Sequence, residues 1–310
     1  MAKRIETKSK KPINRLGFGG WQLGNTEFWG HMAQDEGVVL VKRAIQEGIN
    51  FFDTAPGYAS GASESIIGMA IENNREDLFI ATKYGHTADG ETDFSVFSLR
   101  EQIYSSLERL QTDYLDALIL HNPPWDILEG LTTHVQELNK LKEEGLIRYF
   151  GVSLDSGEEM ELALNHLDID IIEVIFNIFF QEPIDYFKKV NEKNIDLIAK
   201  VPLDSGWLTG KYDEFSEFSG IRMRWDDETI ERRAFLVSRL KSLTTKSDLT
   251  KYAMSFIKSF EEISVVIPGI KSIEQLIDHL NHQDYDISDE LKRAFIDIYD
   301  FYIKDDPLTW

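Results

Sequence analysis

"INFFDTAPGYASGASESIIGMAIENN", residues 49–74, joins a short apolar run to a helical pattern through a loop of small residues. We interpret 49–54 as a buried strand and 63–74 as a helix. The strand ends on a carboxylate, Asp53, and the loop carries a single tyrosine, Tyr58. A turn needs the glycines of this loop, but it needs neither of these two side chains. The stretch therefore predicts one β/α unit with two polar residues that turn formation does not explain.

The same unit recurs along the chain. The apolar runs are nearly continuous, which is typical of strands buried on both faces of a parallel sheet. We predict strands at 14–20, 49–54, 77–85, 114–124, 147–154, 169–177, 195–203 and 263–270. We predict helices at 35–48, 63–74, 95–111, 133–147, 157–167, 183–194, 228–243, 248–260, 273–282 and 288–303.

Eight repeats without a linker favour one domain over residues 1–310, closed into a (β/α)8 TIM barrel. A doubly wound sheet is the second choice, because no GxGxxG motif follows the first strand. The helix at 288–303 and the tail "DDPLTW" are additions at the C-terminal end. The basic start, "MAKRIETKSKKPINR", is interpreted as a solvated arm that is partly paired in a hairpin.

The composition excludes several classes of protein. The chain has 310 residues, no cysteine and a formal net charge of −21. A disulfide framework, a thiol nucleophile and a cysteine-bound metal are therefore ruled out, and the phosphates of nucleic acids would be repelled. No apolar run is long enough to span a membrane, and the basic start is not interpreted as a signal peptide because no apolar segment follows it. We expect a cytoplasmic protein without a nucleic-acid, membrane or metal partner, and the oligomeric state stays open.

Four reactive side chains gather at the ends of predicted strands. Asp53 ends the second strand, Tyr58 lies on the loop after it, Lys83 ends the third strand and His121 ends the fourth. In a parallel barrel the C-terminal ends of the strands share one face, so all four side chains would point into one mouth. Each alone has an ordinary structural explanation, such as a turn cap or a half-buried aromatic. Their conjunction favours a catalytic site.

The four groups suit the protonation of a carbonyl oxygen. A tyrosine hydroxyl has an ordinary pKa of about 10, which a neighbouring ammonium lowers. A carboxylate holds the ammonium in place, and an imidazole can donate a hydrogen bond to a developing alkoxide. A hydride must then come from a cofactor. A different hypothesis makes the chain a hydrolase or aldolase that uses Lys83 for a Schiff base.

These residues lie in segments that resemble the aldo-keto reductase family, over nearly the whole chain. The segments are "FDTAPGYASGASESIIGMAI" (52–71), "IATK" (80–83), "SLERLQTDYLDALILHNP" (106–123), "LKEEGLIRYFGVS" (141–153), "PLDSGWLTGKY" (202–212) and "IPGIKSIEQLIDHL" (267–280). The resemblance implies a (β/α)8 barrel with a short N-terminal β-hairpin. It also implies reversible reduction of aldehydes or ketones, in which Tyr58 is the general acid, Lys83 its activator, Asp53 the partner of that lysine, and His121 the residue that orients the carbonyl.

The resemblance further implies NADPH or NADP+ as cofactor, with NAD less favoured, bound across the barrel mouth. The cofactor-binding residues implied are Ser153, Glu173, Lys200, Leu203, Ser205, Gly206, Leu208, Lys211, Gly269, Lys271, Gln275, Asp278 and His279. The physical chemistry agrees at Lys271, because a cation beside the free N–H groups of a helix start is a phosphate site.

Several positions depart from the usual pattern of the family. Many relatives have Asn where this chain has Leu154, Gln where it has Glu173, and a stacking Tyr where it has Lys200. His279 replaces an adenine-side Asn. These changes affect how the nicotinamide would be held and leave the predicted fold unchanged.

The substrate pocket is expected to be apolar with a few polar tips. Trp21, Trp29, Tyr84 and Asn122 follow strands and would line it. The favoured function is an NADPH-dependent oxidoreductase acting on a small carbonyl compound. The alternative is a cofactor-binding regulatory subunit of the same fold with little turnover.

Overall fold

Eight parallel strands form one sheet in the part of the chain that the computed structural model describes, residues 5–26, 28–244 and 249–309. Their order in the sheet follows their order in the chain. The strands are β1 (Phe18–Gly19), β2 (Phe51–Asp53), β3 (Phe79–Tyr84), β4 (Leu115–His121), β5 (Ile147–Leu154), β6 (Ile171–Ile175), β7 (Asp196–Lys200) and β8 (Ile263–Val266).

The sheet closes on itself between its last and first strands. Leu16 pairs with Val266 and Gly19 pairs with Gly269, both in parallel orientation. The N–H of Val266 also donates to the carbonyl of Arg15, at 2.8 Å. The predicted (β/α)8 barrel is therefore confirmed, and no sheet edge is left at this seam.

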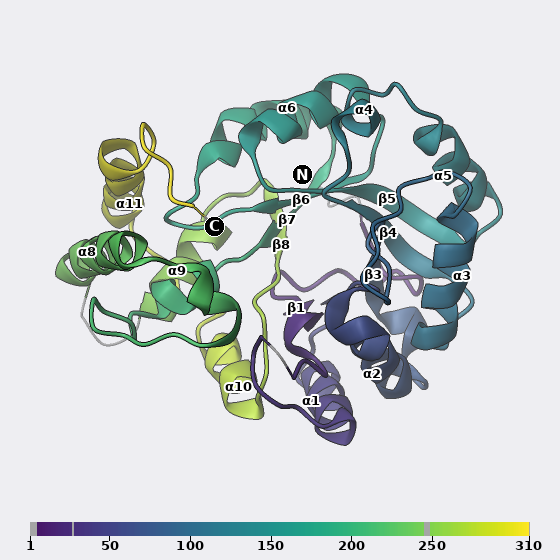
Figure 1. The fold of residues 1–310 in the computed structure, drawn as a ribbon, viewed down its shortest axis with the longest axis horizontal. Helices are drawn as coiled ribbons and strands as arrows, with labels where there is room; N and C mark the ends of the chain where they lie inside the picture. The colour runs from purple at the N-terminus through teal and green to yellow at the C-terminus, as the bar shows by residue number, and fades with distance from the viewer. Residues whose placement is uncertain (1–4, 27, 245–248, 310) are drawn as a thin grey trace.

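The helices surround the strands, as Figure 1 shows. They are α1 (Gln34–Gln46), α2 (Ala62–Ile71), α3 (Leu99–Leu110), α4 (Trp125–Leu128), α5 (His134–Glu143), α6 (Gly157–His166), α7 (Phe187–Lys193), α8 (Asp227–Leu243), α9 (Leu249–Lys258), α10 (Ile273–Asn281) and α11 (Asp289–Tyr302). The additional helices α8 and α11 lie side by side at one edge of the barrel. None of the helices in the described ranges is long and apolar enough to cross a bilayer.

Side chains alternate between the two faces of the strands. Those that point outward pack against the helices in a large apolar core. Those that point inward fill the barrel, as is usual for this fold. The inward apolar residues are Phe51, Phe79, Ala81, Ala117, Ile119, Ile171, Ile198, Val265 and Ile267.

The N-terminal segment covers the end of the barrel at which the strands begin. Ile5 and Ile13 join the inward cluster, and the N–H of Ile5 donates to Asp196 at 3.2 Å. Residues 5–13 form a turn, in which Lys10 donates to the carbonyl of Thr7, and they contain no strand. The expected β-hairpin is therefore reduced to a tight turn within the described residues, because the self-pairing is limited to Thr7 and Lys11 and no strand ladder follows. Residues 1–4 of the expected arm lie outside the described residues.

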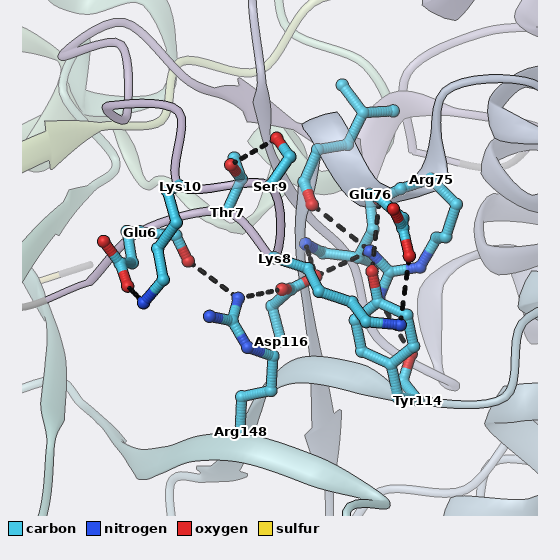
Figure 2. Close-up of polar contacts among 12 residues, drawn as sticks. Glu6, Thr7, Lys8, Ser9, Lys10, Arg75, Glu76, Tyr114, Asp116 and Arg148 are labelled. Carbon is cyan, nitrogen blue, oxygen red and sulfur yellow. Dashed lines mark hydrogen bonds and ion pairs between the residues drawn. The ribbon is translucent and has the colours of Figure 1, made fainter.

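A buried carboxylate, Asp116, organises this end of the molecule (Figure 2). It accepts from Arg75 at 2.7 Å and from Arg148 at 2.8 Å. Arg148 also donates to the carbonyl of Glu6, at 2.8 Å. Two strands, a 3-10 turn and the N-terminal segment are thereby joined at the face where barrel residues serve stability.

The predicted elements are present, with differences at their ends. The strand predicted at 147–154 has the bounds of β5, but the others are shorter than predicted: β1 covers two residues of 14–20 and β8 covers four of 263–270. Ile267 and Ile270 are buried beyond the last residue of β8, and they extend the apolar sequence pattern past the strand. The predicted start of a helix at 248 lies outside the described residues.

Candidate active site

The last inward position of several strands is polar. Nearer the starts of the strands the inward side chains are apolar. The polar side chains therefore form a layer that is the floor of the barrel mouth. Registers place neighbours side by side: His121 pairs with Ser153, and Ser153 pairs with Glu173. The layer consists of Asp53, Lys83, His121, Ser153, Glu173 and Lys200.

Lys83 and Asp53 form a buried ion pair at the centre of this layer. The Lys83 Nζ atom lies 2.5 Å from Asp53 Oδ1 and 2.7 Å from Oδ2, and it donates to the carbonyl of Thr54 at 3.2 Å. Glu173 Oε1 is 3.6 Å from the same nitrogen. Burial alone would lower the pKa of Lys83, but attraction to Asp53 and Glu173 raises it above its ordinary value. Lys83 is therefore a charged ammonium.

This ion pair leaves Lys83 unsuited to a Schiff base. The side chain is about 1% exposed, and its donors are engaged by Asp53 and by the Thr54 carbonyl. A Schiff base requires a free, neutral amine. The geometry therefore disfavours the aldolase or hydrolase hypothesis.

Tyr58 lies at the start of a strained loop after β2. Ala59 and Ser60 have φ of 50° and 52°, in the left-handed region that residues other than glycine rarely adopt, and Gly61 follows with φ of 86°. The ring centroid lies 6.1 Å from that of His121 in an edge-to-face arrangement, and Lys83 Nζ is 5.0 Å from the Tyr58 centroid. The strained turn thus directs the phenol toward the polar layer.

The ends of this loop are fixed by buried hydrogen bonds. Thr54 and Ser63 share a bond of 2.8 Å, and Ser63 donates to the carbonyl of Gly20, also at 2.8 Å. Glu64, at the start of α2, accepts from Thr82 at 2.6 Å. These contacts stabilise the conformation that the left-handed residues oppose.

The net effect of the surroundings is to keep Tyr58 protonated. Burial raises the pKa of its hydroxyl, Lys83 lowers it, and Asp53 and Glu173 raise it again. The expected lowering by the ammonium is present, but burial outweighs it. A protonated phenol beside an ammonium can donate a proton to an oxygen that gains negative charge.

His121 is neutral in this environment. Burial lowers the pKa of its imidazole well below the ordinary value, and the positive charges of Lys83 and Lys200 lower it further. The His86 ring lies 5.1 Å away, edge to face. A neutral imidazole retains one N–H, so it can donate a hydrogen bond without adding a charge.

A second ion pair lies beside the first. Lys200 Nζ is 2.8 Å from Ser153 Oγ and 2.7 Å from Asp155 Oδ1. Asn122 donates to the other oxygen of Asp155, at 2.6 Å. Ser153 in turn donates to Glu173, at 3.0 Å. Polar contacts therefore connect Glu173 to the loop that follows His121.

A cavity of about 620 Å³ opens above the polar layer. Asp53, Tyr58 and His121 line it, together with Trp21, Trp29 and Asn122 from the expected substrate pocket. Most of the expected cofactor residues also line it: Glu173, Lys200, Leu203, Ser205, Gly206, Lys211, Gly269, Lys271, Gln275, Asp278 and His279. The volume lies within the range of small-molecule sites.

Four of the expected site residues do not line the cavity. Lys83 and Ser153 are buried in the polar layer beneath it, and Leu208 is buried in the core. Tyr84 was expected in the substrate pocket, but its side chain points elsewhere. Its hydroxyl donates to the carbonyl of Ser95 at 2.7 Å, and its ring packs in the apolar core between the strands and the helices. Since Lys83 points inward, strand alternation directs Tyr84 outward, and it does not belong to the substrate pocket.

The far end of the cavity is the start of α10. The Ser272 side chain caps this helix by accepting from the N–H of Gln275, and the Gln275 side chain accepts from the N–H of Lys271 at 3.0 Å. The Lys271 ammonium is exposed and donates to the carbonyl of Trp29, at 3.3 Å. A cation beside a helix N-terminus is suited to bind a phosphate group.

Three lining residues with ionisable side chains, His86, Asp155 and Arg222, were not among the residues expected at the site. His86 and Asp155 lie one or two residues beyond the ends of β3 and β5. Arg222 stands 4.6 Å over the Trp29 ring and donates to the carbonyl of Ser205. Asp155 had a usable signal, because it is a carboxylate just after a strand end. Arg222 had none, since its loop position depends on tertiary packing.

The barrel and the polar layer at its mouth are those of an oxidoreductase that acts on carbonyl or alcohol groups. A comparison with protein families matches residues 15–295 to the Aldo/keto reductase family. The chain belongs to this family.

Known proteins of this kind are similar over most of their length. L-galactose dehydrogenase of Arabidopsis thaliana is 29% identical over 85% of this chain and 82% of its own. The NADH-specific methylglyoxal reductase of Escherichia coli (strain K12) is 25% identical over 89% and 92%. The structure of glycerol dehydrogenase AKR11B4 from Gluconobacter oxydans has a TM-score of 0.80 and 26% identity, over 94% and 93% of the two chains.

Proposed function

We propose that this protein reduces the carbonyl group of a small aldehyde or ketone with NADPH, reversibly, and that Tyr58 donates the proton. The observation that carries the proposal is the position of Tyr58. It is the protonated group that lines the cavity next to both the Lys83–Asp53 ion pair and the neutral His121.

Each member of this group has a distinct part. The Tyr58 phenol gives its proton to the carbonyl oxygen as negative charge develops there. The Lys83 ammonium stabilises the tyrosinate that remains, and Asp53 holds that ammonium in place. His121 donates a hydrogen bond that orients the carbonyl and stabilises charge on its oxygen. The positive charge beneath the phenol is fixed before any substrate arrives.

Polar groups along the cavity would suit the successive parts of NADPH. NADPH supplies the hydride when it is bound. Lys271 and the start of α10 would hold its phosphate at one end, and Glu173, Lys200 and the Ser153 beneath them would surround the nicotinamide at the other. Ser205 and Gly206 would lie along the part between them. The buried Glu173 Oε2 has no hydrogen-bond partner among the described residues, which is consistent with a ligand at this end.

Lys271 is the reason for proposing NADPH over NADH. The Escherichia coli relative is named for NADH, so family membership alone does not decide the cofactor. An exposed ammonium at a helix N-terminus favours the cofactor that carries an additional phosphate.

The direct test uses the purified chain with NADPH or NADH and a panel of small aldehydes, ketones and sugars. We expect loss of the reduced-nicotinamide absorbance, faster with NADPH, in the presence of at least one carbonyl compound. Cofactor binding without turnover across the panel would contradict the proposal and would favour the regulatory-subunit alternative.

A further inference from the structure

The polar layer and the adjoining Asp155 contain two ammonium groups that are already paired with carboxylates, and Glu173 is a third carboxylate beside them. Lys83 holds Asp53 at 2.5 Å, and Lys200 holds Asp155 at 2.7 Å. Glu173 lies 3.6 Å from Lys83 and has no closer cation among the described residues. With His121 neutral and Tyr58 protonated, the layer and Asp155 together hold three carboxylates and two ammonium groups.

The surplus carboxylate is buried at a cost. The Glu173 side chain is about 2% exposed, and its Oε1 accepts from Ser153 at 3.0 Å. Its Oε2 is buried without a hydrogen-bond partner in the described part of the chain. Burial and then the neighbouring Glu173 raise the pKa of Asp53 well above its ordinary value, while Lys83 opposes the rise. A cation brought to this wall of the cavity would relieve both costs.

We propose that Glu173 makes this site bind the oxidised nicotinamide more tightly than the reduced form. The inference rests on the proposed function, which puts the nicotinamide at this end of the cavity. The oxidised ring carries a positive charge and the reduced ring carries none, so only the oxidised form compensates the surplus carboxylate. Glutamine at this position would offer the same shape without the charge.

Lys200 acts in the opposite sense. Its ammonium neutralises Asp155 and stands on the same wall of the cavity as Glu173. Removing this cation leaves a second carboxylate uncompensated. The two substitutions therefore shift the balance between the oxidised and reduced cofactor in opposite directions, which a general loosening of the site would not do.

The test measures the dissociation constants of NADP+ and NADPH by titration calorimetry, with no substrate present. We expect Glu173→Gln to lower the preference for NADP+ by about tenfold, the effect of one charge a few ångströms away in a partly polar site. Lys200→Gln raises the same preference. Glu161→Gln, which removes a carboxylate from the exposed surface of α6, leaves it unchanged.

An unchanged preference in Glu173→Gln would overturn the inference, as would shifts of the same sign in the Glu173 and Lys200 variants. Failure of the unmodified protein to bind either cofactor is a different result. It would refute the proposed function itself.

Discussion

Lys83 is held in the barrel by the two carboxylates around it, and those carboxylates depend on it in turn. Removing its charge leaves Asp53 buried without its partner, which costs about 3–5 kcal/mol in other buried pairs. We predict that Lys83→Met lowers the free energy of unfolding by that amount and abolishes carbonyl reduction. Urea unfolding and steady-state kinetics measure the two effects.

The double variant Lys83→Met/Asp53→Asn separates stability from catalysis. Removing the orphaned charge recovers most of the lost stability, because the pair is then replaced by neutral groups. Activity stays absent, since the phenol still lacks its ammonium. Recovery of activity together with stability would show that Lys83 has only a structural part.

The buried imidazole of His121 is expected to make the stability of the protein depend on pH. Burial lowers the pKa of its imidazole in the folded chain, so the unfolded chain, with an ordinary value near 6.5, binds more protons below that pH. The stability that depends on a neutral His121 is fully present above about pH 6.5. It is lost as the pH falls toward the pKa of His121 in the folded chain, by at most about 1.4 kcal/mol per pH unit. His121→Gln should therefore lose less stability on acidification.

Urea midpoints at a series of pH values measure this difference. His166→Gln removes an exposed histidine at the end of α6 and serves as the control. Parallel pH curves for the unmodified protein and His121→Gln would contradict the prediction.

Individual residues show where sequence reasoning succeeds and where it stops. Asp53, Lys83 and His121 could be placed together because each ends a strand of a parallel barrel. Tyr84 was assigned to the mouth by its nearness in sequence to Lys83, yet alternation along the strand directs it to the helices. The pairing of Lys200 with Asp155 was not predictable, because a loop conformation after β5 brings the two together.

Among the elements, the start of α10 is the feature on which the proposed preference for NADPH rests. We predict that Lys271→Ala weakens NADPH binding by about tenfold to a hundredfold, as the loss of a charge-assisted contact to phosphate does, and leaves NADH binding nearly unchanged. Fluorescence titration with both cofactors measures this. Lys42→Ala, an exposed lysine of α1, is the control. Equal weakening of both cofactors would contradict a phosphate contact.

The order and type of the elements were predictable from the hydrophobic periodicity and from the glycine and proline residues between the runs, because eight apolar runs alternate with amphipathic helices. Their ends were less so. The run 263–270 continues past the ladder since Ile267 and Ile270 are buried without being in a strand. The strain at Ala59 and Ser60 was also hidden, because nothing in two small residues indicates a left-handed backbone.

On the scale of the whole molecule, the two ends of the barrel have separate tasks. The mouth carries the ionisable layer, whereas the opposite end carries the Asp116 network that joins two strands to the N-terminal segment. We predict that Asp116→Ala lowers the free energy of unfolding by about 3–5 kcal/mol, because Arg75 and Arg148 lose their buried partner. The turnover of the protein that remains folded is unchanged.

Urea unfolding and kinetics corrected for the folded fraction check this separation. Asp113→Ala, an exposed residue just before β4, is the matched control and leaves both quantities unchanged. A large fall in turnover with little loss of stability would contradict the division of tasks.

The most direct test of the account is Tyr58→Phe, which removes one hydroxyl and keeps the ring that packs beside His121. The measurement pairs kcat/KM for a carbonyl substrate with the Kd of NADPH. We predict a fall in kcat/KM of at least about a hundredfold and a nearly unchanged Kd, since the phenol donates a proton and does not hold the cofactor. Turnover close to that of the unmodified protein would contradict the central claim that Tyr58 is the proton donor.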